Sequence, residues 1–143
     1  MQYKSQAKIF KFAYDNSLIE MEKIIAWADA IIAQENNPPI WVIEISLSSP
    51  KDLPSLLDEV PGPENIKEIW LGLKRVLRDA VECKKLRPES AIGYLNALMQ
   101  DKIAPKNDYD DILYFIMNWD VVEEGFIEKK ELVKELLHYL EKN

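Results

Sequence analysis

Apolar residues recur at three- and four-residue intervals along almost the whole chain, and this spacing constrains the possible fold more than any other feature. Residues 63–85 give the clearest example, since their apolar stripe consists of Ile66, Ile69, Trp70, Leu73, Val76, Leu77 and Ala80. The opposite side carries Lys67, Lys74, Arg78 and Lys85. Pro63 suits the first position of such a helix. We therefore predict an amphipathic helix over residues 63–85 whose stripe faces a core.

The same spacing predicts further helices over residues 2–14, 17–35, 88–100, 108–123 and 128–142. Ser17 is a natural N-cap for the second of these segments, and Gly125 is placed to end the helix over 108–123. Residues 17–35 and 108–123 are apolar around most of their circumference and are expected to be deeply buried. Because residues 108–123 leave little polar face, that helix is expected at the centre of the fold.

Residues 40–47, IWVIEISL, can be interpreted in two ways. Their β-branched content and alternation favour a strand. No second strand pattern exists elsewhere in the sequence, however, and a lone strand would leave its backbone groups unpaired. We therefore predict a short helix, followed by another that ends near residue 59. The complete prediction is an all-α fold, one compact domain over residues 1–143 with seven or eight helices and short connections.

Residues that support catalysis are scarce. The one histidine, His138, lies on the polar side of the last predicted helix, and the four glycines are scattered singly. Zinc sites need several Cys or His ligands, and phosphate-binding loops need clustered glycines. The acidic run over residues 107–111 lacks the turn glycine of a calcium loop and is interpreted as a cap for the next helix, with Asn107 as its N-cap. We predict no catalytic residue, no metal ligand and no cofactor.

Overall composition limits the location and the partners. No apolar run reaches the roughly 18 residues of a membrane span, and the first residues do not resemble a signal peptide. A single cysteine, Cys83, cannot form an internal disulfide, so a cytoplasmic location is expected. The net charge of −7 argues against general binding to nucleic acid.

Charge is distributed unevenly along the sequence. Residues 1–14 and 64–87 each carry a net charge of +3, whereas residues 15–60 carry −7 and residues 101–143 carry −5. Neighbouring helices can pair part of this charge internally. The remaining negative charge must face solvent, where it favours a basic protein partner and speeds encounter with it.

Candidate partner-binding residues come from the acidic segments and from one tryptophan. Trp41 follows a proline-rich turn and is expected nearest the surface, where it would act as an apolar anchor. The acidic candidates are Asp52, Asp58, Glu59, Asp108, Asp110, Asp111, Glu123 and Glu124. Asp29, Glu44 and Asp120 lie in apolar surroundings; they either project from helix edges or pair with cations of 63–87, or they line the rim of a binding groove. The sequence leaves these alternatives open.

Two stretches resemble a recurring pattern in small helical bacterial proteins. They are WADAII from Trp27 and NPPIWVIEISL from Asn37, and the closing EGFI from Glu124 is similar too. Several proteins with this pattern look like immunity proteins encoded beside polymorphic toxins. The resemblance covers most of the chain. It implies an all-helical, non-enzymatic, cytoplasmic protein that neutralises a cognate toxin, and it carries no catalytic or binding residues to this sequence.

These observations favour a binding protein, an immunity-like inhibitor whose acidic helical face masks a basic toxin surface. The main alternative is a self-associating structural domain of a larger complex, so the sequence leaves monomer or homodimer undecided. A third alternative is a metal enzyme that uses converging carboxylates.

Overall fold

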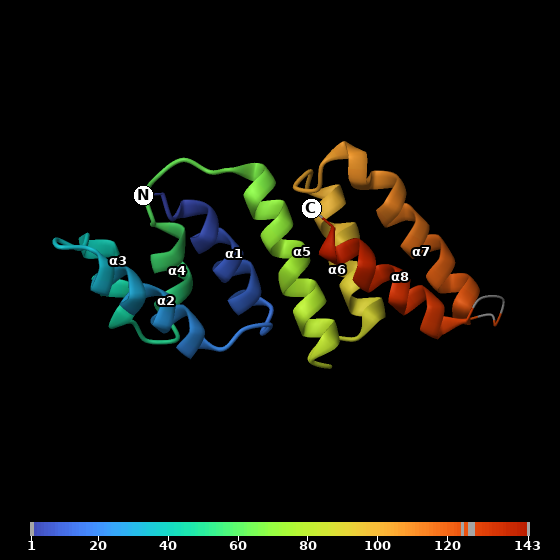
Figure 1. The fold of residues 1–143 in the computed structure, drawn as a ribbon, viewed down its shortest axis with the longest axis horizontal. Helices are drawn as coiled ribbons and strands as arrows, with labels where there is room; N and C mark the ends of the chain where they lie inside the picture. The colour runs from blue at the N-terminus through green and yellow to red at the C-terminus, as the bar shows by residue number, and fades with distance from the viewer. Residues whose placement is uncertain (1, 124, 126–127, 143) are drawn as a thin grey trace. The chain divides into compact units, whose positions relative to one another are not determined.

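The chain is helical in the computed structural model, which describes residues 2–123, 125 and 128–142, without the side chain of Glu123. These residues contain eight α-helices, one 3-10 turn and no strand (Figure 1). The helices are α1 (Lys4–Asp15), α2 (Met21–Gln34), α3 (Ile40–Ser46), α4 (Leu53–Asp58), α5 (Ile66–Glu82), α6 (Pro88–Gln100), α7 (Tyr109–Glu123) and α8 (Lys129–Glu141). The predicted all-α fold is confirmed, and so is the helix over residues 40–47.

Two compact units divide the chain. We call residues 1–69 the N-terminal unit and residues 70–143 the C-terminal unit. Helix α5 runs through the boundary between them, with its first turn in the N-terminal unit. That the whole chain behaves as a single domain remains a prediction.

The N-terminal unit is built from α1 to α4. Helix α2 packs against α3, α1 packs against α4, and α3 also contacts α4. Its fully buried side chains include Ala7, Ala13, Ile24, Ala28, Val42, Ile45, Leu53 and Leu57. Only one side of α2 is buried, because Asp29 and Ala30 are exposed. The expectation that residues 17–35 are buried around most of their circumference is therefore wrong.

In the C-terminal unit, α7 contacts both α6 and α8. The fully buried side chains of this unit include Leu77, Leu95, Ile112, Leu132, Leu136 and Leu140. Although α7 is apolar nearly all round, Leu113, Tyr114 and Met117 remain exposed on it. The expectation that this helix is deeply buried all round is thus wrong, and its place at the centre of the fold stays a prediction. The apolar surface of α7 is larger than the area that α6 and α8 cover.

Lys74 also departs from its predicted place. The sequence puts it on the polar side of α5, yet the residue is only 3% exposed. It follows Leu73 directly and lies one turn after Trp70, at the edge of the buried stripe. A binary apolar–polar pattern cannot identify such an edge position, because the pattern assigns every lysine to solvent.

Helix ends differ most from the sequence prediction. Ser17 is not the N-cap of α2, because it adopts a φ of 58° just beyond the end of α1. Its N–H donates to the Tyr14 carbonyl at 3.1 Å, and the Leu18 N–H donates to Ala13 at 2.7 Å. This is a Schellman ending, and it delays α2 until Met21.

The ends of α5 and α6 have the same geometry, with φ of 61° at both Lys84 and Lys102. Gly125, with a φ of 84°, follows α7 as predicted.

Two predicted helix starts are also shifted. Helix α5 begins at Ile66 and not at Pro63, because the Asn65 side-chain oxygen accepts the Glu68 N–H at 3.0 Å and caps the helix there. Asn107 lies inside the 3-10 turn Lys106–Asp108, so it is not the N-cap of α7.

Candidate functional site

Helix α3 is short and apolar on opposite sides. Val42 and Ile45 are fully buried in the core of the N-terminal unit, whereas Ile40 is 75% exposed and Leu47 is 81% exposed. Ile43 lies between these two and is also exposed. Since residues 40, 43 and 47 are spaced by three and four positions, they form one stripe along the outer side of α3, which ends at Leu47, the residue directly after the helix.

A groove of about 560 Å³ runs beside this stripe. Residues of α3, α4 and the segment between them line it: Ile43, Glu44, Leu47, Ser48, Ser49, Asp52, Ser55 and Leu56. Two of these serines are held locally. Ser48 Oγ donates to the Ile45 carbonyl at 2.7 Å, and Ser49 Oγ donates to Asp52 Oδ2 at 3.0 Å. The groove therefore combines apolar side chains with fixed hydroxyl and carboxylate groups.

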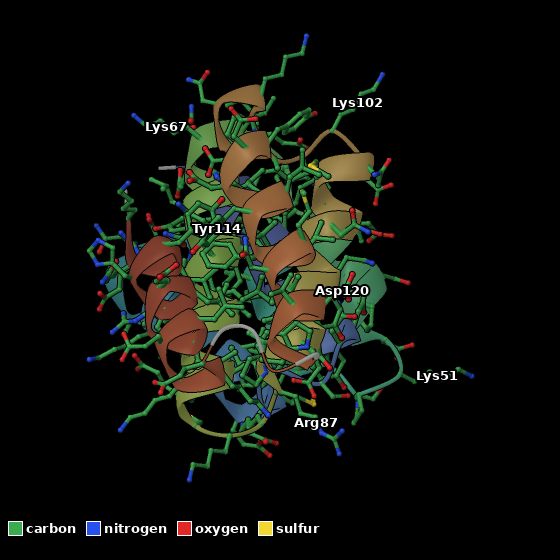
Figure 2. All side chains as sticks on the ribbon, turned by 90° about the vertical axis from the view of Figure 1, so that its right-hand side faces the viewer. Lys51, Lys67, Arg87, Lys102, Tyr114 and Asp120 are labelled. Atoms are coloured by element: carbon green, nitrogen blue, oxygen red, sulfur yellow. The ribbon has the colours of Figure 1, made fainter. Side chains whose placement is uncertain are left out.

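The electrostatic character of this region is acidic. Glu44 and Asp52 are exposed beside the groove. Between residues 24 and 66 the chain carries seven carboxylates and one cation, Lys51, whose side chain points outward (Figure 2). We use the name α3–α4 surface for Ile40, Ile43, Leu47, Glu44 and Asp52 together. It offers an apolar stripe with negative charge beside it.

Trp41, the predicted aromatic anchor, packs against other aromatic rings. Trp41 is half-buried and belongs to an aromatic cluster, with its ring 5.9 Å from that of Tyr3 and 6.0 Å from that of Trp27. The Trp27 indole N–H donates to Gln6 Oε1 at 2.8 Å, which fixes the cluster to α1. Trp41 thus supports α3 from the core side, and its neighbours Ile40 and Ile43 occupy the exposed positions.

Asp58 and Glu59, the other acidic candidates of the N-terminal unit, lie at the end of α4. Both are exposed. The Asp58 carboxylate is 4.0 Å from Lys11 Nζ, and the backbone carbonyl of Asp58 accepts a hydrogen bond from Lys4. Asp58 is therefore already partnered by cations of α1, whereas Asp52 stands beside the groove.

The acidic candidates of the C-terminal unit divide into two kinds. Asp110 and Asp111 are exposed in the first turn of α7, where their charge also favours the helix N-terminus. Asp108 lies one turn earlier with a side chain only 19% exposed. Glu123 lies in α7 without a described side chain, and Glu124 lies outside the described residues. The structure gathers the candidates into separate sets, one in each unit.

Asp108 is the centre of a buried polar network, which we call the Asp108 network. Its Oδ2 accepts the Tyr139 hydroxyl at 2.6 Å and the Trp70 indole N–H at 3.1 Å, and it lies 3.9 Å from Lys74 Nζ. The Lys74 ammonium also sits 4.7 Å from the centre of the Tyr139 ring. These four side chains satisfy one another, so Asp108 is a structural residue and not part of an exposed acidic face.

Burial shifts two pKa values in this network. It lowers the pKa of the Lys74 ammonium, against the opposing effect of Asp108 and Asp111. Burial, and then the hydrogen bond to Asp108, raise the pKa of the Tyr139 hydroxyl far above its ordinary value of 10.0. Because Lys74 is only 3% exposed, it offers no reactive amine at the surface.

Asp29, Glu44 and Asp120 are all exposed. The Asp29 carboxylate accepts a hydrogen bond from Ser46 Oγ, and Glu44 lines the groove. That this groove binds a partner stays a prediction. Asp120 lies on the side of α7 away from Tyr114 (Figure 2).

Sequence reasoning missed both exposed apolar stripes. Besides the outer side of α3, Leu113, Tyr114 and Met117 are exposed on α7, and the Tyr114 hydroxyl donates to Glu135 of α8 at 2.5 Å. That hydrogen bond raises the pKa of Tyr114. The sequence does contain a signal for these stripes. Helices α3 and α7 carry more apolar residues than helices that are so short, or that so few neighbours cover, can bury.

Three further findings concern the histidine, the possible metal ligands and the length of the helices. His138 is exposed on α8, as predicted. Within residues 2–123, 125 and 128–142, no three His, Cys, Asp or Glu side chains cluster so that they could hold a metal ion. None of the helices described has the length and apolar character that crossing a membrane requires. No protein-family model, curated protein or solved structure matches the chain.

Proposed function

We propose that the chain is a non-enzymatic binding protein, an immunity-like inhibitor that covers a basic surface of a cognate toxin. The observation that carries this proposal is the α3–α4 surface, where Ile40 and Leu47 are exposed beside the carboxylates of Glu44 and Asp52. An exposed apolar patch with a polar rim is typical of protein interfaces.

The two kinds of side chain in this surface have different tasks. Desolvation of Ile40, Ile43 and Leu47 would slow dissociation of the complex, because buried apolar contacts act mainly on the off-rate. Glu44 and Asp52 would attract a cationic surface and raise the association rate. The inhibitor would act by occupying the toxin surface and excluding its substrate. The exposed free thiol of Cys83 supports a reducing, cytoplasmic location for this complex.

The test is co-expression with the product of the neighbouring gene. We expect that product to stop growth alone and to be tolerated when this chain is present. The double variant Ile40→Ser, Leu47→Ser should lose protection, whereas Asp120→Asn, a charge change at an exposed site of α7, should keep it. A neighbouring product that is harmless alone, or that still kills in the presence of this chain, would refute the toxin proposal.

Self-association is a second candidate function, favoured by the exposed Leu113, Tyr114 and Met117 on α7. An uncovered apolar helix face can become the shared surface of a homodimer. Sedimentation at micromolar concentration measures this directly. A dimer that Met117→Ser dissociates would support it, and a strict monomer would exclude it.

A further inference from the structure

We infer that the α3–α4 surface receives a basic amphipathic helix, whose apolar side chains contact Ile40, Ile43 and Leu47 and whose lysines or arginines reach Glu44 and Asp52. This inference rests on the proposed function, because it names the part of the partner that enters the surface.

The shape of the surface matches a helix. The exposed stripe of α3 runs from residue 40 to residue 47, a rise of about 10 Å at the helical repeat. Partner helices that bind in grooves use anchors at positions i, i+3 or i+4, and i+7, which cover the same length. Leu56 of α4 adds further apolar lining to the groove. A helix laid along α3 would thus contact apolar side chains from two directions.

The charge of the surface favours a cationic partner. Among the described residues, the ion pairs of the N-terminal unit use Asp15, Asp58 and Glu64, which are bound by lysines of α1. Glu44 and Asp52 take part in none of the ion pairs found in this part of the chain. Their charge is therefore available to a partner, and cations at the edges of an apolar helix face would lie close to it.

A second copy of the chain is a poorer occupant. A symmetric dimer places the same patch of both copies in contact, so Glu44 and Asp52 would approach their own equivalents. Like charges in such a contact are unfavourable. The α3–α4 surface therefore fits a partner of opposite charge better than it fits itself.

The experiment uses a labelled peptide of about 18 residues, with leucines at i, i+3, i+4 and i+7 spacing and lysines elsewhere. It is titrated with the full chain at low and at high salt. We expect Ile40→Ser, Leu47→Ser to weaken binding about tenfold at both salt concentrations, because the loss is apolar. Glu44→Gln, Asp52→Asn should weaken binding about fivefold at low salt, and salt should remove most of this difference.

Two controls separate a specific site from general attraction to an acidic protein. Asp79→Asn, Asp120→Asn makes the same charge change at exposed positions of α5 and α7 and should weaken binding less than about twofold. A peptide of the same composition with its leucines scrambled should bind at least about tenfold more weakly, because it presents no apolar face. Equal binding by the scrambled peptide, or equal weakening by the two charge variants, would overturn the inference.

Failure of the inference differs from failure of the proposed function. If the full chain neutralises the toxin but its α3 variants bind the helical peptide as tightly as the unaltered chain, the helix-binding inference is wrong and the inhibitor function stands. If the peptide binds as expected but the neighbouring gene product is harmless, the surface binds basic helices and the toxin proposal is wrong.

Discussion

One lysine in each unit shows two opposite environments for a paired cation. In the N-terminal unit, Lys8 pairs with Glu64 at 2.7 Å, and both side chains are about 40% exposed. In the C-terminal unit, Lys74 is buried and shares the Asp108 carboxylate with Tyr139. An exposed pair contributes little to stability, because water already solvates both charges. A buried charge depends on its partner side chain for stabilisation, because water cannot take the place of that partner.

This difference indicates which side chains can be substituted without destabilising the fold and which cannot. The α3–α4 surface consists of side chains that face solvent, so changing them should affect binding and leave the fold intact. The Asp108 network consists of side chains that satisfy one another, so removing one leaves others unpaired inside the protein. We expect the largest effects on stability in the C-terminal unit, followed by effects common to both units.

The largest expected effect is that of Asp108→Ala. This change leaves the Lys74 ammonium, the Tyr139 hydroxyl and the Trp70 indole N–H without their common acceptor. Breaking a buried ion pair by removing one partner costs about 3 kcal/mol or more. We therefore expect the free energy of unfolding in urea to fall by about that amount. Asp110→Ala, two residues further along and exposed, is the matched control and should cost less than about 1 kcal/mol.

Deletion of one core side chain from each unit is expected to have the next largest effect. Leu57 of the N-terminal unit and Leu136 of the C-terminal unit are both fully buried. Each leucine-to-alanine change should cost about 3 kcal/mol. Because α5 continues through the boundary, we expect one cooperative transition that both variants shift, as the single-domain prediction requires. Two transitions, each shifted by only one variant, would show instead that the units unfold independently.

Alkaline pH should weaken the C-terminal unit through Tyr139. Its pKa is raised in the folded chain, so above pH 10 the unfolded chain releases a proton that the folded chain keeps. Unfolding is then favoured by about 1.4 kcal/mol for each pH unit above 10. Lys74 acts in the opposite sense at lower pH, because its lowered pKa makes stability rise with pH until about 10.5.

The measurement is urea unfolding between pH 8 and pH 11, with tyrosine ionisation followed by absorbance. Tyr139→Phe should abolish most of the alkaline loss, at a cost of about 1 kcal/mol at neutral pH for the lost hydrogen bond. Tyr114→Phe is the control, because the Tyr114 hydroxyl is also hydrogen-bonded to a carboxylate but its residue is exposed. If the Tyr139→Phe variant loses as much stability above pH 10 as the unaltered chain does, Tyr139 is not the group that causes the loss.

The sequence predicted the helices well because apolar spacing is a property of each segment alone. Residues 40–47 became a helix, and not a strand, because no partner strand existed to pair with them. Burial was harder to predict. Lys74 and Asp108 are individually ordinary polar residues, separated by 34 positions, and only the tertiary fold brings them within 3.9 Å of each other. The exposed stripe of α3 was hidden for the opposite reason, since isoleucine and leucine are normally assigned to a core.

Helix ends were the least predictable local feature, because the usual signal was absent. A Schellman ending commonly places glycine at its left-handed position. Here Ser17, Lys84 and Lys102 occupy that position with φ near 60°. Nothing in those residue types indicates a left-handed conformation. The sequence therefore predicts Ser17 as the start of α2, whereas in the structure Ser17 follows the end of α1.

Glycine at these positions should therefore stabilise both units slightly, by the same amount in each. A left-handed residue with a Cβ costs about 1 kcal/mol, and the greater freedom of glycine in the unfolded chain cancels part of the gain. We expect Ser17→Gly in the N-terminal unit and Lys102→Gly in the C-terminal unit each to raise the free energy of unfolding by about 0.5 kcal/mol.

Ala97→Gly is the matched control for the second change, because Ala97 is exposed within the same helix, α6. Its substitution should lower stability by about 1 kcal/mol, since glycine is unfavourable in a helix interior. Opposite signs for two glycine substitutions only five residues apart would show that the backbone conformation decides the effect. If Lys102→Gly lowers stability as Ala97→Gly does, the left-handed ending of α6 does not form in solution.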